Sequence, residues 1–346
     1  MNTLLIGCSG YIGSHLIKRL RSKNKDMRID GIDTGWFSKD ITGVVRPPEQ
    51  GLDQYKPMDM RNIGKDDLKG YDCIIQLGAV SNDPIGDKFG NATRSINKEA
   101  TCRIYEMASE VNVRSYVFAS SCSVYGIDSG IPKKEDDELS PLTEYAKSKI
   151  ECEQFFETLN SDIRTTNLRF ATACGYTSRT RLDLVLNEFV VMALTEKKIT
   201  IKSDGTPWRP LIHVEDMCKA IEWAMTREQG EKICTVNVGT ESNNIRMKDL
   251  AAKVSAQIDN CDIDISASSG NIDKRSYQVD FSKYKKLSSR NNKDFMSIDD
   301  SIKDLRENLS KIEDLSTVYK KGLWKRLYRL NEYLSEGVLD KNLNWV

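Results

Sequence analysis

The stretch "LLIGCSGYIGSHLIKRL", residues 4–20, decides the fold. An apolar run ends at Gly7, and an amphipathic segment follows over residues 12–23. Gly7, Gly10 and Gly13 lie between the two patterns in a GxxGxxG spacing. Glycines there permit a tight turn and let the backbone approach a pyrophosphate, while the start of the helix offers free N–H groups. The stretch therefore predicts a strand, a glycine-rich turn and a helix that bind a dinucleotide.

An acidic residue at the end of the next apolar run supports this prediction. The run "RIDGID" ends in Asp33, 20 residues after Gly13. A carboxylate at this spacing is placed to hydrogen-bond the ribose hydroxyls of the adenosine half. Because the same carboxylate repels a 2′-phosphate, NAD is favoured over NADP. The alternative is that Asp33 is an ordinary loop or capping residue.

The first half of the chain alternates short apolar runs with helical patterns. The runs at 3–7, 28–33, 72–79, 115–121 and 164–170 predict strands, and the segments 12–23, 92–111 and 142–160 predict helices. This alternation predicts a Rossmann-type α/β fold, a doubly wound parallel sheet, over residues 1–175. Loops lengthen afterwards, with helices expected at 184–196 and 215–227. We therefore expect residues 176–346 to form mainly a smaller, partly interleaved substrate-binding lobe, with some segments returning to the first domain.

A last helix is expected at 317–336. Its stripe of leucines is interpreted as packing on the domain, with the basic residues solvated on the opposite face. A membrane-surface helix is the alternative interpretation.

Composition narrows the possible partners. The 346 residues contain 51 Lys and Arg against 51 Asp and Glu, and this balance argues against nucleic acid as the main partner. No run approaches the roughly 18 apolar residues of a membrane span, and the first residues lack a basic leader. We expect no signal peptide, no membrane partner and a cytoplasmic location. The nine cysteines form no CxxC pair, which fits reduced thiols. Only two histidines occur, which argues against a histidine-based metal site and against a Ser-His-Asp hydrolase.

The stretch "TEYAKSKIE" places Tyr145 and Lys149 four residues apart on a predicted helix, hence on one face. A free tyrosine has a pKa of about 10 and is a poor base at neutral pH. A nearby ammonium and the positive nicotinamide ring would favour its phenolate form. The pair then makes a general acid/base suited to hydroxyl and carbonyl chemistry. A serine-rich strand end, "FASSCSVYG" at 118–126, precedes it and includes Ser121.

Taken together, these motifs resemble the extended short-chain dehydrogenase/reductase family, in its NAD-dependent nucleotide-sugar epimerase/dehydratase branch, over roughly residues 1–310. The resemblance implies that Ser121, Tyr145 and Lys149 are catalytic, and that Lys149 also holds the nicotinamide ribose. It further implies a homodimer that pairs the 92–111 and 142–160 helices. The cofactor contacts expected are Gly7, Gly10, Tyr11, Ile12, Gly13, Asp33, Asp59, Met60, Leu77, Gly78, Ala79, Ser120, Tyr145 and Lys149.

The resemblance also implies a site for a nucleotide-diphosphate sugar. Arg209 and Arg275 are expected to pair with the diphosphate, because a guanidinium makes bidentate bonds to phosphate. The alternative for either arginine is a surface salt bridge. Arg181 is a further candidate. Contacts to the sugar or the diphosphate are also expected from Ser81, Asn82, Ser123, Thr172 and Asn187, although Thr172 stands where many members have Asn. His213 is interpreted as a packed residue and Asp216 as a helix cap.

One departure from the family separates its reactions. Sugar 4,6-dehydratases carry an Asp-Glu pair directly after the catalytic hydroxyl, whereas Cys122 and Ser123 occupy those places here. A thiol and a hydroxyl do not readily replace a paired acid and base, so dehydration is disfavoured. The leading hypothesis is epimerisation, with C4 favoured, through a transient keto-sugar. The alternatives are a nucleotide-diphosphate keto-sugar reductase, a nucleotide-diphosphate sugar dehydrogenase and a non-catalytic dinucleotide sensor.

Overall fold

The computed structural model describes residues 1–43, 46–81, 83–126, 130–265 and 276–346. Within them lies a parallel sheet of seven strands in the order β10-β6-β5-β4-β1-β2-β3. Its strands are β1 (Asn2–Ile6), β2 (Arg28–Asp33), β3 (Gln54–Pro57), β4 (Cys73–Gln76), β5 (Ser115–Ser121), β6 (Arg164–Phe170) and β10 (Ile233–Val238). The order reverses at β1, as in a doubly wound dinucleotide-binding sheet, and confirms the predicted fold class.

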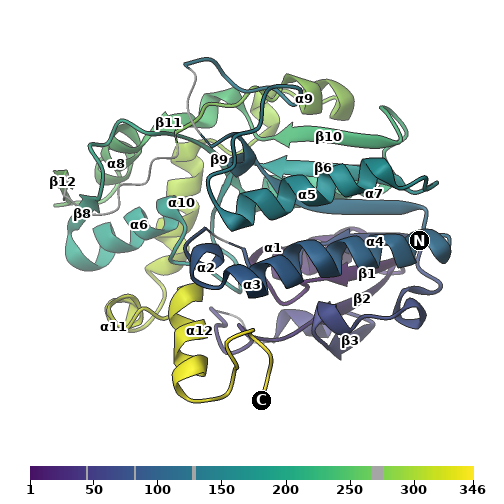
Figure 1. Ribbon diagram of the computed structural model, residues 1–346. Coiled ribbons are helices and arrows are strands. Elements are labelled where there is room, and N and C mark those ends of the chain that lie inside the picture. The colour runs from purple at the N-terminus through teal and green to yellow at the C-terminus, as the bar shows by residue number, and fades with distance from the viewer. Residues whose placement is uncertain (44–45, 82, 127–129, 266–275) are drawn as a thin grey trace.

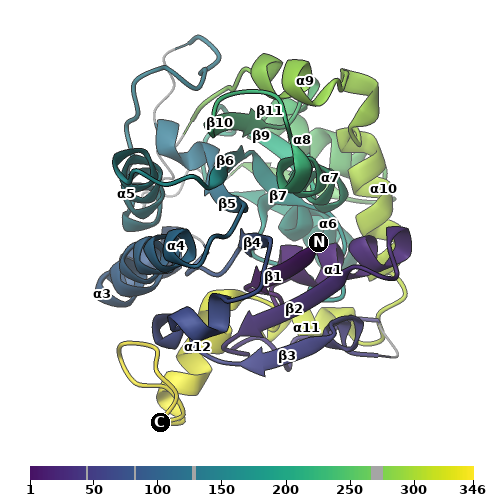
Figure 2. The same cartoon turned by 90° about the vertical axis from the view of Figure 1, so that its right-hand side faces the viewer.

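Helices cover both faces of this sheet, which explains why its central strands read as continuous apolar runs. Alternate residues of one strand face opposite layers: Leu5 packs toward α1 (Tyr11–Lys23) and α7 (Val214–Thr226), and Leu4 packs toward the other face. That other face carries α4 (Thr101–Glu110) and α5 (Glu144–Thr158). Figure 2 shows the two helical layers on either side of the strands. The carboxyl ends of the strands are thereby left open between the layers.

The second half of the chain builds smaller units beside this end of the sheet (Figure 1). Two short sheets are present in the described chain, one of β11-β9-β7 and one of β12-β8. Their strands are β7 (Thr172–Cys174), β8 (Lys198–Ile201), β9 (Trp208–His213), β11 (Asn244–Arg246) and β12 (Asp262–Ile265). The helices are α6 (Val185–Glu196), α8 (Met247–Ser255), α9 (Ser282–Ser288) and α10 (Ile298–Leu309). A core of their own holds α6, α8 and α10 together.

Two predicted helices differ from the structure. The 92–111 helix is composed of α3 (Gly90–Thr93), a π-helical segment over Arg94–Ala100, and α4, after a short α2 (Asp83–Lys88). The single helix predicted at 317–336 is wrong, because α11 (Leu315–Lys320) and α12 (Arg326–Ser335) are separate. Gly322 and Trp324 between them have φ angles of 69° and 61°, which a continuous right-handed helix cannot contain.

The leucine stripe of the last segment packs on the body of the protein, as predicted. Leu327, Leu330 and Leu334 join the core beneath β1, β2 and β4. The basic residues of the segment are solvated only in part: Lys320 and Lys321 are exposed, as expected, whereas Arg326 is only 2% exposed. In the described residues no helix has the length and apolar character needed to cross a membrane. All nine cysteines are unpaired thiols.

Candidate active site

A cavity of about 940 Å³ opens at the carboxyl ends of the central strands. Every residue that we expected to contact the cofactor lines it, including the glycine turn after β1 and Asp33 at the end of β2. Ser121, Ser81, Ser123, Thr172 and Arg209 line the same space. Ligands of doubly wound folds bind in this position. The structure therefore brings the cofactor, catalytic and most substrate candidates into one site.

The glycines of the turn are needed by the backbone itself. Gly7 has a φ of 86°, and a Cβ there would come within 2.5 Å of the Gly78 nitrogen. A Cβ on Gly13 would come within 2.5 Å of the Gly7 carbonyl oxygen, so only glycine lets α1 pack against the turn. The N-terminus of α1 thus reaches the cavity with its N–H groups and positive dipole end, which suit a pyrophosphate.

Asp33 presents a carboxylate to the cavity beside this turn. One of its oxygens accepts a hydrogen bond from the Ser9 N–H at 3.0 Å, and the other accepts from the Gly35 N–H at 2.8 Å. Burial raises the pKa of Asp33, while these two N–H donors lower it. A fixed, buried carboxylate at the end of β2 suits two ribose hydroxyls and disfavours a phosphate in their place. The residues present therefore fit NAD.

Asp59 lines the cavity with its carboxylate already engaged. It accepts a hydrogen bond from the Arg61 N–H at 2.8 Å and binds the Arg61 guanidinium at 3.0 and 2.7 Å. Met60 lines the cavity beside Asp59 and offers it an apolar surface.

Tyr145 and Lys149 project into the cavity from the first turns of α5. The hydroxyl of Thr143 caps this helix by accepting from the Ala146 N–H at 3.2 Å. Burial raises the pKa of the Tyr145 phenol, whereas the hydrogen bond with Ser121 and the charge of Arg181 lower it. Burial also lowers the pKa of Lys149, to about 8. Ser121 and Arg181 thus adjust the acidity of the phenol, whereas the sequence had pointed to the Lys149 ammonium for this effect.

The serine-rich end of β5 divides into distinct roles. Ser121 accepts a hydrogen bond from the Ser123 N–H at 3.1 Å and starts a 3-10 turn. Ser123 lines the cavity, and its hydroxyl is buried with no hydrogen-bond partner within the described chain. Cys122 points away, and its thiol donates to the Arg169 carbonyl at 3.1 Å. Burial holds the pKa of Cys122 well above its usual range, so this residue is not an acid/base group of the site.

A buried ionic network, which the sequence did not reveal, holds this strand end in place. The Ser120 hydroxyl donates to Glu153, one turn beyond Lys149 on α5. Glu153 in turn binds the Arg169 guanidinium at 2.7 Å, and Arg169 donates to the Tyr125 hydroxyl at 3.0 Å. These contacts tie β5, β6 and α5 together directly below the catalytic candidates. The only sequence signal was the presence of charged residues within otherwise apolar strand and helix patterns.

The structure places two of the arginines expected to bind substrate at the cavity. Arg209 lies on β9 with its guanidinium 5.7 Å from the centre of the Tyr277 ring, and both residues line the cavity. Arg181 also reaches it, bound to Asp183 at 2.9 and 3.0 Å and to the Ser81 hydroxyl at 3.2 Å. Asn82 and Arg275 lie outside the described residues.

Asn187 is the predicted substrate contact that the described structure places away from the cavity. Its side chain is fully buried and bonded to backbone groups, accepting from the Gly175 N–H at 3.1 Å and donating to the Arg181 carbonyl at 2.9 Å. Because both ends of the amide are occupied in this way, Asn187 positions the loop that carries Arg181.

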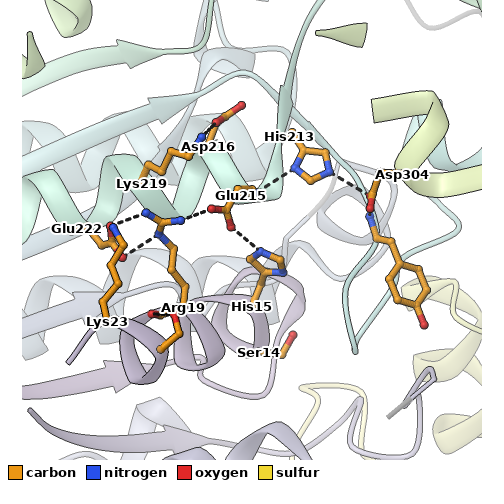
Figure 3. Close-up of polar contacts among 12 residues, drawn as sticks. Ser14, His15, Arg19, Lys23, His213, Glu215, Asp216, Lys219, Glu222 and Asp304 are labelled. Atoms are coloured by element: carbon orange, nitrogen blue, oxygen red, sulfur yellow. Dashed lines mark hydrogen bonds and ion pairs between the residues drawn. The ribbon is translucent and has the colours of Figure 1, made fainter. Parts of the chain in front are cut away.

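Two histidines belong to a polar network behind the site (Figure 3). His15 binds Glu215 at 2.9 Å, and Arg19 joins Glu215 to Glu222, so that α1 is tied to α7. His213 caps α7 and binds Asp304 at 3.1 Å, which fits the interpretation as a packed residue. The cap expected from Asp216 is thus supplied by His213. Asp216 accepts a hydrogen bond from the Met296 N–H at 2.8 Å instead.

Comparisons with known proteins agree with this geometry. The family described as "NAD dependent epimerase/dehydratase family" matches residues 3–239, and the chain belongs to it. An uncharacterised UDP-glucose epimerase, YtcB of Bacillus subtilis, is 30% identical over 69% of this chain and 77% of its own length. The family is NAD dependent, and the cofactor of this enzyme is NAD.

Solved structures share the fold across most of the chain. The NAD-dependent NDP-hexosamine 5,6-dehydratase TunA has a TM-score of 0.77 at 18% identity, covering 90% of this chain and 98% of that one. The UDP-glucuronic acid 4-epimerase of Bacillus cereus, crystallised with UDP-glucuronic acid and NAD, has a TM-score of 0.74 at 22% identity, covering 90% and 100%.

Proposed function

We propose that this protein is a nucleotide-diphosphate sugar 4-epimerase that uses NAD and returns it unchanged. The observation that carries the proposal is the meeting of Tyr145, Ser121 and Lys149 at the cavity where Asp33 and the glycine turn fit NAD. Relatives named as UDP-glucose 4-epimerases, such as that of Lactobacillus helveticus at 25% identity, support the choice of reaction.

The residues divide the chemistry in a simple way. The Tyr145 phenolate takes the proton of the sugar hydroxyl, and the Ser121 hydroxyl donates a hydrogen bond that steadies the charge on these oxygens. NAD, held by the glycine turn, Asp33 and Lys149, would supply the hydride acceptor for the same carbon and would allow the hydride to return to the other face of the keto-sugar. Tyr145 then gives its proton back to the new hydroxyl. Atoms balance, because every proton and hydride removed is returned.

Two features support epimerisation over dehydration. An elimination needs an acid and a base beside the catalytic hydroxyl, and Cys122 is buried with a raised pKa and its thiol is bonded to the Arg169 carbonyl. The Ser123 hydroxyl does not ionise near neutral pH, so it replaces neither the acid nor the base of an elimination.

The cavity also offers contacts for the substrate. Arg209, against Tyr277, supplies a cation for the diphosphate, and Ser81 and Thr172 supply hydroxyls for the sugar.

The experiment is to incubate the purified protein with UDP-glucose, UDP-N-acetylglucosamine and UDP-glucuronic acid, and to follow products by NMR and NADH by its absorbance. We expect one pair of C4 epimers to reach equilibrium without net NADH. Continuous NADH formation with a single oxidised product would identify a dehydrogenase instead, and an unsaturated sugar would identify a dehydratase.

A homodimer is proposed with this function. The helices α4 and α5 lie side by side on one outer face of the sheet, where two copies could form a four-helix bundle (Figure 2). Light scattering at micromolar concentration tests it: a mass near twice the 39.2 kDa of the chain is expected, and a monomer would contradict it.

A further inference from the structure

The C-terminal segment, residues 314–346, lies beyond the part of the chain that matches the family and borders the cofactor half of the cavity. Figure 1 shows it in yellow, with α12 and the C-terminal turn below α2. Leu327 and Arg326 of α12 line the cavity, as does Gly322 before them. This segment is therefore part of the wall of the site.

Its anchors lie where the adenosine half of NAD is expected. The Trp345 indole donates to the Thr34 carbonyl at 2.8 Å, and Thr34 directly follows Asp33. The Arg61 guanidinium donates to the carbonyls of Asn342 at 2.8 Å and Leu343 at 3.1 Å, next to Met60 in the cavity wall. The end of the chain is thus fastened to the loops that follow β2 and β3.

Arg326, the first residue of α12, is the unusual group in this wall. It is 2% exposed, and its guanidinium lies 3.9 Å from the centre of the Phe37 ring. Its Nη1 is 3.5 Å from Asp40, and its Nη2 has no hydrogen-bond partner in the described parts of the chain. A buried guanidinium with an unused donor is costly unless an anion completes its surroundings.

The neighbouring carboxylates are held more closely by other arginines. Asp40 binds Arg329 at 2.6 and 3.1 Å, and Asp183 binds Arg181 at 2.9 and 3.0 Å. Burial, with repulsion from Arg181, lowers the pKa of Arg326 to about 10. Arg326 is the least compensated cation of this group.

The position of Arg326 indicates which anion it meets. It is close enough to Asp33 to lower the pKa of that carboxyl, and it also interacts with Arg181, which acts on Tyr145. Arg326 packs on Phe37, four residues after Asp33, and its backbone N–H lies 3.4 Å from Asp183, the partner of Arg181, so it borders both the loop after Asp33 and the loop of Arg181. The part of NAD that joins its two riboses is the pyrophosphate.

We infer that Arg326 donates hydrogen bonds to the pyrophosphate of bound NAD, so that the C-terminal segment holds the cofactor in its site. The glycine turn and α1 offer backbone N–H groups to the same pyrophosphate, and Arg326 adds a full positive charge from a segment far away in the sequence. Slow release of NAD would suit a cycle that regenerates it. That consequence rests on the proposed epimerisation, whereas the contact itself does not.

The test measures NAD affinity and release in the full-length protein, by calorimetry and by chase of a fluorescent NAD analogue. Arg326→Gln is expected to weaken NAD binding by about 10- to 100-fold, the usual effect of losing a charge-assisted hydrogen bond. Arg326→Lys keeps the charge and is expected to recover part of the loss. Arg329→Gln is the matched control, because Arg329 lies one turn further along α12 and binds the same Asp40 without lining the described cavity.

Ligand fragments identify the anion. ADP-ribose, which retains the pyrophosphate, should lose affinity for the Arg326→Gln protein as NAD does, and adenosine should not. Equal losses of NAD affinity in the Arg326→Gln and Arg329→Gln proteins would overturn the inference, since both would then reflect packing. So would an unchanged NAD affinity with weaker binding of UDP-glucuronic acid to the NAD-loaded protein, because the anion would then belong to the sugar. If the wild-type protein binds NAD but epimerises no sugar, the proposed function fails and the Arg326 result stands.

Discussion

The Lys149 ammonium lies 5.5 Å from the centre of the Tyr145 ring, one helical turn away on α5. It also lies 4.7 Å from the centre of the Phe118 ring, in surroundings dry enough to bring the pKa of Lys149 to about 8. Tyr145 shares this burial and has a raised pKa. Burial therefore moves the two pKa values apart, that of Lys149 downward and that of Tyr145 upward, because it disfavours the charged form of each group.

Replacing Tyr145 by Phe removes the proton-transfer group and little else. We expect kcat to fall about 100- to 10,000-fold, the usual contribution of general acid–base catalysis. NAD content and nucleotide-sugar affinity should stay near wild type, because the ring remains. Steady-state kinetics and calorimetry on the same preparation separate these quantities. A variant that keeps its turnover would remove Tyr145 from the mechanism.

Ser121→Ala should move the pH–rate profile toward higher pH. The hydrogen bond from Ser121 lowers the pKa of Tyr145, and its loss raises that pKa further. Since the base works as the phenolate, activity at pH 7 falls and is partly regained in alkaline buffer. A hydrogen bond to a charged group corresponds to a midpoint shift of about one to two pH units. An unshifted profile with uniformly lower rates would contradict this role.

Lys149→Met should stabilise the nucleotide-free protein below about pH 8. The folded-state pKa of Lys149 is about 8 and its ordinary value is 10.5, so the unfolded chain binds more protons between these limits. The unfolding free energy of the wild type therefore rises with pH across this window. The unfolding free energy of the variant lacks this pH dependence. At pH values below 8 the variant should be more stable than the wild type by about 3 kcal/mol, and this difference should shrink to near zero by pH 10.5.

Denaturant unfolding at several pH values measures this difference. Lys147→Met is the control, because Lys147 is an exposed lysine of the same helix. Its effect on the unfolding free energy should be small and nearly independent of pH. A Lys149→Met protein that is less stable than the wild type at pH 7 would contradict the account of burial.

Glu153→Gln should destabilise the protein far more than Glu144→Gln on the same helix. Glu153 and Arg169 are about 95% buried, and removing one charge leaves the other unpaired at a cost of about 3–5 kcal/mol. Glu144 pairs with Lys147 at the surface, where the loss is under about 1 kcal/mol. Equal losses in denaturant unfolding would show that the network below Ser120 is not what supports the site.

The sequence predicted the parts of this protein that rest on local patterns. Each of these features is set within one short segment of the chain: the glycine turn, the position of Asp33, and the spacing of Tyr145 and Lys149. The strand β3 was not predicted, because Gln54–Pro57 lies exposed at the sheet edge and carries no apolar run. The strand β10 was also missed, since it joins β6 from more than 60 residues further along the chain.

The contacts that escaped prediction are those made between distant segments. Asn187 was expected at the diphosphate, but the chain fold turns its amide toward Gly175 and Arg181. The basic residues of the last segment were expected to be solvated, but Arg326 is only 2% exposed. The break at Gly322 and Trp324 turns it into the cavity wall instead, and only the folded chain brings it near Asp33.

The central claim is that hydride leaves a sugar carbon and returns to the same sugar. The most direct measurement uses UDP-hexose carrying deuterium at C4, with the purified protein in ordinary water, and NMR of both sugars at equilibrium. The account predicts two C4 epimers, each with deuterium retained at C4 and no net NADH. Loss of the label with accumulating reduced cofactor, or a single unsaturated product, would contradict it.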